Sequence, residues 1–151
     1  MKPKTKIIIN GKEILLEDSA QQLTLEFFDL LSKDLKELVI NDDGGDEFKS
    51  KLKEFDISED KRFGNDWHFA INEKSKPLLS EVLRTCTQKQ WGHFRYSLIG
   101  RDFRIDFEDV SDEIVEPEYA KEGIISLFEI KSSGSNLGLI ESLLETNVFK
   151  E

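Results

Sequence analysis

Apolar and polar residues near the start of the chain follow the pattern of a β-hairpin. Three isoleucines, Ile7 to Ile9, precede the dipeptide Asn10-Gly11, and a second apolar stretch occupies residues 13–16. Asn-Gly readily takes the positive φ angles that a tight type I′ turn requires. We therefore expect two antiparallel strands that are joined at Asn10-Gly11.

Three later segments have apolar residues spaced by three and four, which is typical of amphipathic helices. The first covers residues 20–37, with Ser19 as a candidate N-cap. The second begins at Ser75 or Lys76, carries Pro77 in its first turn and ends near Gln90. The third covers residues 137–148 and follows the Ser- and Gly-rich segment 132–136, which we expect to be a flexible linker.

Residues 65–72, 91–99 and 103–107 alternate between apolar and polar, as half-buried strands do. A turn at 100–102 would join the last two into a second hairpin. Residues 38–40 fit a short strand, 124–130 fit either a strand or a short helix, and 48–62 fit either a helix or a loop. The order of elements predicts an α+β fold with a mainly antiparallel sheet, built from two hairpins and flanked by two or three helices. The expected organisation is one domain over 1–131, a linker over 132–136 and a C-terminal helix over 137–151.

Composition and net charge argue against several classes of function. A chain of 151 residues with 38% hydrophobic residues and eleven phenylalanines can bury a substantial core as one domain. Its net charge of −10 argues against binding nucleic acid or an anionic membrane, and favours either a basic protein partner or simple solubility. No apolar run approaches the ~20 residues that span a bilayer. The single cysteine excludes an internal disulfide, and the short apolar N-terminal stretch does not fit a signal peptide, so we expect a cytoplasmic protein.

An acidic run follows the strand at 103–107. The segment from Ile105 to Glu118 is rich in acidic residues and contains no basic residue. Such a run fits a docking surface for a basic partner, a solvated loop, or a carboxylate pair for acid–base or metal chemistry. We predict a docking surface, with Trp91 and Tyr96 as aromatic anchors unless they belong to the core. The predicted partner-binding carboxylates are Asp106, Glu108, Asp109, Asp112, Glu113 and Glu116.

The other candidates for metal binding or catalysis are the two histidines, residues 41–47 and Cys86. His68 and His93 are the only histidines, and together with nearby carboxylates they leave a metal-dependent enzyme as an alternative. Residues 41–47 resemble a calcium loop in composition, but their glycines come too early for an EF-hand. Cys86 falls on the apolar face of a predicted helix and fits a small core hydrophobe better than a nucleophile. We therefore expect no catalytic residue, no bound metal and no cofactor.

The stretch from Leu78 to Glu113 resembles a known family. A helix over 78–84 precedes Trp91, an aromatic strand over 94–98 follows, and a further strand reads Phe-Arg-Ile-Asp-Phe-Glu-Asp-Val over 103–110. This order resembles the C-terminal half of the YezG-like immunity proteins of bacterial polymorphic toxin systems. Their corresponding strand reads roughly Phe-Lys-Ile-Asp-Tyr-x-Tyr-Glu-Asp, and the Tyr-containing dipeptide is missing here.

The resemblance implies a small, acidic, single-domain immunity protein that is not an enzyme. Such a protein would bind one cognate toxin and neutralise it by protein–protein docking. The toxin domain that it binds is commonly a basic C-terminal nuclease. An interaction or adaptor domain in another pathway is the main alternative. A homodimer formed through the C-terminal helix also stays open.

Overall fold

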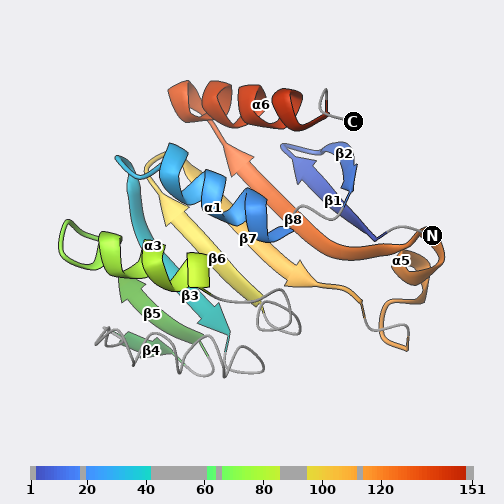
Figure 1. Cartoon of the computed structure of the whole chain (residues 1–151), viewed down its shortest axis with the longest axis horizontal. Coiled ribbons are helices and arrows are strands. Elements are labelled where there is room, and N and C mark those ends of the chain that lie inside the picture. The colour runs from blue at the N-terminus through green and yellow to red at the C-terminus, as the bar shows by residue number, and fades with distance from the viewer. Residues whose placement is uncertain are drawn as a thin grey trace.

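A single eight-stranded sheet organises the described part of the chain (Figure 1). The computed structural model describes residues 3–17, 20–41, 61–63, 66–85, 95–111 and 114–148. The strand order is β2-β1-β8-β7-β6-β3-β5-β4, and every neighbouring pair is antiparallel except β1 and β8. The strands are β1 (Lys4–Ile9), β2 (Lys12–Glu17), β3 (Leu35–Asn41), β4 (Lys61–Phe63), β5 (Asp66–Ala70), β6 (Arg95–Gly100), β7 (Phe103–Asp109) and β8 (Ile124–Ser132).

Three helices pack on one face of this sheet, which we call the inner face (Figure 1). They are α1 (Ala20–Leu30), α3 (Ser75–Thr85) and α6 (Gly134–Val148). A fourth, short helix, α5 (Pro117–Glu122), lies between β7 and β8 in the chain and contacts β8. The predicted α+β class, with a mainly antiparallel sheet that contains the β1–β2 and β6–β7 hairpins, is confirmed.

The β1–β2 turn forms as its sequence predicts. Asn10 and Gly11 have φ angles of 47° and 88°, which are both in the region that a type I′ turn uses. The Asn10 side chain also donates to the Ser132 carbonyl oxygen at 3.0 Å and accepts from the Ser132 N–H at 3.1 Å. The turn residue thus fastens the end of β8 as well as closing the hairpin.

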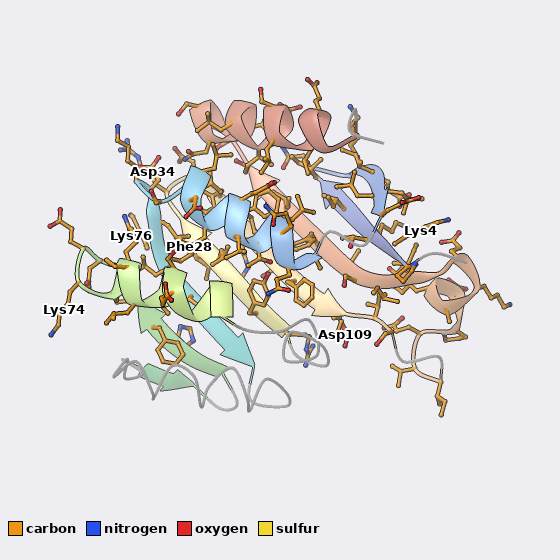
Figure 2. All side chains as sticks on the ribbon, viewed as in Figure 1. Lys4, Phe28, Asp34, Lys74, Lys76 and Asp109 are labelled. Atoms are coloured by element: carbon orange, nitrogen blue, oxygen red, sulfur yellow. The ribbon has the colours of Figure 1, made fainter. Side chains whose placement is uncertain are left out.

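The core lies between the inner face and the helices. Period-two alternation sets buried aromatic and aliphatic side chains beside one another across the strands. Phe128 of β8 is the cross-strand partner of both Ile7 and Phe107. The Phe27 ring of α1 packs edge-on against the Phe128 ring, with their centroids 5.7 Å apart. Phe28, also buried, lies where α1 and α3 approach each other (Figure 2). The inward-facing residues of the strands and the apolar face of α1 therefore form one hydrophobic core.

The first helix is shorter than predicted. It ends at Leu30, the chain turns over residues 31–34, and β3 begins at Leu35 instead of Leu38. Leu35 and Leu38 fit the helical spacing, yet both are buried as strand residues. The strand prevails because β3 pairs with β5 on one side and β6 on the other. Those two ladders satisfy its backbone groups in a way that the sequence pattern alone does not reveal.

The predicted flexible linker at 132–136 is wrong. Strand β8 extends to Ser132 and α6 begins at Gly134, whose φ of 63° lets the chain reverse direction. Asn136 is buried, and its side-chain N–H groups donate to Asp34 Oδ2 at 3.0 Å and to the Arg101 carbonyl oxygen at 2.9 Å. The C-terminal helix is therefore part of the same core, to which it contributes Ile140 and Leu144.

Several other expectations are settled by the described residues. The segment 65–72 contains β5, with Phe69 and Ile71 buried, and 124–130 is a strand. The second helix begins at Ser75, and the undecided segment 48–62 contributes the start of β4. Outside the described residues lie all of 42–60 (including most of the calcium-like loop), Ser19, Cys86, Trp91 and His93. No described helix has both the length and the apolar character needed to cross a membrane.

Candidate partner-binding surface

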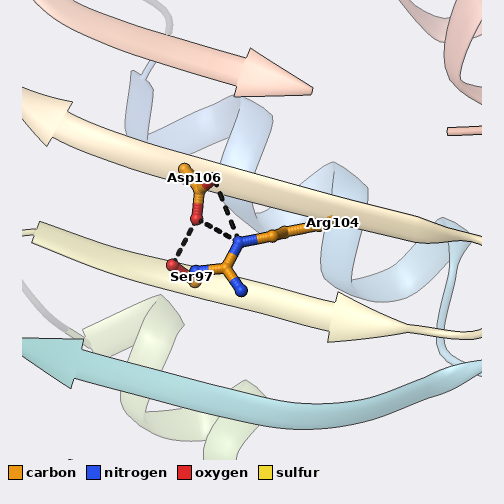
Figure 3. A network of polar contacts seen from close by, with 3 residues as sticks. All are labelled: Ser97, Arg104 and Asp106. Carbon is orange, nitrogen blue, oxygen red and sulfur yellow. Dashed lines mark hydrogen bonds and ion pairs between the residues drawn. The ribbon is translucent and has the colours of Figure 1, made fainter. Parts of the chain in front are cut away.

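The outer face of the sheet, opposite the helices, carries a polar network on the β6–β7 hairpin (Figure 3). Ser97 and Asp106 are cross-strand partners, and Arg104 lies two residues before Asp106 on the same face. Ser97 Oγ donates to Asp106 Oδ1 at 2.5 Å, and Arg104 Nε donates to both carboxylate oxygens at 2.9 and 3.2 Å. Asp106 is therefore a carboxylate whose charge is partly balanced within the protein.

This network borders a shallow basin of about 310 Å³ on the outer face. The basin is lined by carboxylates such as those of Glu108 and Glu129, by guanidinium groups such as that of Arg95, and by a few apolar side chains such as that of Leu127. Glu129 is the cross-strand partner of Asp106, and Glu108 is that of Arg95. With charges of both signs side by side, the basin has no strong preference for a cationic or an anionic ligand.

The described residues of the acidic run are divided between β7 and α5. Asp109, at the end of β7 (Figure 2), accepts from the Ser111 backbone N–H at 2.8 Å and so shapes the turn that follows. Glu116 is the N-cap residue of α5, and Glu118 lies in its first turn, where the helix dipole favours negative charge. The predicted site residues Asp112 and Glu113 lie outside the described residues.

Two exposed apolar residues lie inside the acidic run, and the sequence interpretation missed them. Ile114 is 91% exposed and Val115 is 68% exposed, directly before Glu116. Most large apolar side chains of the described residues are buried, so an adjacent exposed pair is unusual. The available signal was the pair itself, because two β-branched residues between four acidic ones belong to no predicted strand or helix.

Tyr96 is not a surface anchor. Its side chain points to the inner face, is 4% exposed and stacks on Phe107 with ring centroids 4.8 Å apart. The phenol hydrogen-bonds Thr24 of α1. Burial raises the pKa of Tyr96 well above its ordinary value, and the bond to Thr24 opposes this rise only in part. The prediction that Tyr96 binds a partner is therefore wrong, because strand alternation puts it in the core.

His68 has a carboxylate partner. Its Nδ1 lies 2.8 Å from Glu37 Oε1, across the β3–β5 pair. Glu37 and His68 lie on the outer face. On that face Val39 lies between His68 and Ser97, because it is the cross-strand partner of both. No group of three or more histidine, cysteine, aspartate or glutamate side chains is arranged to hold a metal ion among the residues that the structure describes.

Around the predicted site residues the structure thus offers two features for a partner: a polar basin on the outer face, and an apolar pair within an acidic segment that leads into α5. The chain was compared with protein-family models, with curated proteins and with solved structures, and none of the three comparisons gives a match.

Proposed function

We propose that this protein is an immunity-type binding protein that neutralises a basic toxin domain by docking to it. The observation that carries this proposal is the exposed pair Ile114 and Val115 within the acid-rich segment between β7 and α5. Binding surfaces commonly combine an apolar centre, which excludes water, with charged surroundings that select the partner.

Charge and apolar contact would do different work in this complex. The net charge of −10 and the carboxylates Glu116 and Glu118 would attract a basic domain and speed the encounter. Burial of Ile114 and Val115 would supply affinity, at about 1.5–3 kcal/mol for each side chain that is fully buried. Asp106 and Asp109 contribute less, since each already accepts hydrogen bonds within the protein.

The first experiment isolates the partner. The tagged protein would be used to capture proteins from its native lysate, and a single stoichiometric basic protein eluted by salt would then be purified and assayed. Immunity requires that this protein be toxic when expressed alone, and that the toxicity disappear when both are expressed together. A stoichiometric partner without toxicity would favour an adaptor role instead.

The acidic segment is then tested in the purified complex. In the double variant Glu116→Lys and Glu118→Lys we expect association to slow about tenfold at low salt, with a weaker salt dependence. Replacing Ile114 and Val115 by alanine should mainly speed dissociation. Glu73→Lys with Glu81→Lys is the matched control, because both glutamates are exposed near or on α3, far from α5 (Figure 1). Equal effects of the two charge reversals would remove the acidic segment from the mechanism.

A further inference from the structure

Strand β2, at one end of the sheet, has an open edge among the described residues. It pairs with β1 on one side, and no described strand lies on its other side. The two-residue turn makes Ile9 and Lys12 a hydrogen-bonded pair, so Ile14 also directs its backbone groups to β1. By the same alternation Glu13 and Leu15 direct their N–H and C=O groups to the open edge. Such an edge is a template for another strand.

A groove lies between the first half of β2 and α6. It has a volume of about 270 Å³, and its apolar lining comes from Ile9, Ile14 and Leu144. In Figure 1 the C-terminal end of α6 lies above β2. A strand added to β2 would therefore direct alternate side chains into the groove, beneath the helix.

The charges around the groove define what it would accept. Glu141 and Glu145 of α6 line it, together with Lys12 and with Glu13, whose carboxylate pairs with Lys6 at 3.2 Å. The last turn of α6 also contains no basic residue, so the negative end of the helix dipole is not offset there. Cationic side chains on an incoming strand would be attracted to this rim.

We propose that the β2 edge binds an extended segment of a basic protein by strand addition. The side chains on one face of that segment would meet the groove: apolar ones would enter it, and lysines or arginines on the same face would lie against Glu141 and Glu145 at its rim. This proposal is independent of the one for the acidic segment, because it concerns other residues and other contacts.

A second copy of this chain fits the edge less well. Two chains of net charge −10 repel each other. Symmetric pairing centred on Leu15 would place Glu13 opposite Glu17 of the second copy, and pairing centred on Ile14 would bring the acidic rims of both grooves together. A basic strand avoids both conflicts.

The test uses a defined probe, an eight-residue peptide with blocked ends and the sequence Lys-Thr-Val-Thr-Val-Thr-Lys-Thr, so that lysine and valine share the face that meets the groove and threonine occupies the other face. Its binding would be followed by the amide shifts of the isotope-labelled protein. We expect shifts confined to β2 and the C-terminal half of α6. A peptide with methylated alternate backbone nitrogens should bind about tenfold more weakly or worse, because it loses the N–H donors that pair with β2. A peptide with glutamate in place of lysine should not bind.

Protein variants provide the matching evidence. Leu15→Pro removes an N–H that faces the open edge and should weaken binding about tenfold, whereas Leu15→Ala keeps that N–H and should bind almost normally. Glu141→Lys with Glu145→Lys should weaken binding by a similar factor. The proposal is overturned by no binding at millimolar peptide, by equal binding of the methylated peptide, by shifts centred elsewhere, or by self-association through β2. The methylated peptide keeps the test decisive if Leu15→Pro fails to fold.

Discussion

At the residue scale, single positions show how closely the inner face is packed against α1. Tyr96 brings a hydroxyl into an apolar layer, and its partner Thr24 is also buried. Thr24 Oγ1 donates to the Ala20 carbonyl oxygen at 2.9 Å, so the phenol O–H is the donor in the bond to Thr24. Every polar atom of this pair is therefore satisfied, which makes a buried hydroxyl tolerable.

Tyr96 should give the protein a specific sensitivity to alkaline pH. The unfolded chain loses this proton near pH 10, while burial keeps the folded form protonated because its pKa is raised. The contribution is therefore complete below pH 10 and is lost as the pH rises above it, by up to about 1.4 kcal/mol per pH unit. Urea unfolding of the wild type and Tyr96→Phe should show this as a gap between their free energies of unfolding that changes with pH. A constant gap would contradict it.

Gly100 is a second position where packing dictates the residue. A Cβ atom added there would overlap the Phe103 ring and the Asp34 carbonyl oxygen. Gly100→Ala should therefore lower the free energy of unfolding by about 1–3 kcal/mol, measured by urea denaturation. Gly138 of α6 is the matched control, since nothing lies within 4 Å of its added Cβ. Gly138→Ala should raise stability by up to about 1 kcal/mol, through helix propensity. Similar losses at both sites would show that Gly100 is not crowded.

At the element scale, local signals predicted the elements better than their ends. Both hairpins follow from turn residues and strand alternation, which act within a few positions. The end of α1 and the start of β3 do not, because Leu35 and Leu38 satisfy helix spacing and strand burial equally well. The start of α6 was missed for a related reason: the Ser- and Gly-rich composition of 132–136 conceals the bonds made by Asn136.

Helix α6 should contribute to stability as a core element and not as an appendage. Ile140 is completely buried, whereas its neighbour Leu139 is 43% exposed. Ile140→Ala should lower the free energy of unfolding by about 2–5 kcal/mol, and Leu139→Ala by much less. Chemical denaturation of the two variants compares a buried and an exposed side chain on the same helix. Comparable small effects would mean that α6 is only loosely attached.

At the scale of the whole molecule, strand order distributes the functional groups. Strand β8 lies between β1 and β7 and joins two hairpins that are about 90 residues apart in the chain. Its insertion makes the outer face continuous from β1 to β6 and sets Glu129 beside Asp106. It also leaves β2 as the terminal strand at one end of the sheet, with the C-terminal end of α6 above it in Figure 1. Both the basin and the edge groove are therefore products of the topology.

The sequence by itself determined the α+β class, both hairpins, the approximate positions of α1, α3 and α6 and the excess of negative charge, but not the short helix α5. These features depend on turn chemistry, on periods of two and 3.6 residues and on composition, all of which are local. Tertiary structure alone decided that Tyr96 is a core residue, that Asp106 is bound by Ser97 and Arg104, and that Ile114 and Val115 are exposed. Those outcomes depend on which strands pair and which face the helices cover, and long-range packing sets both.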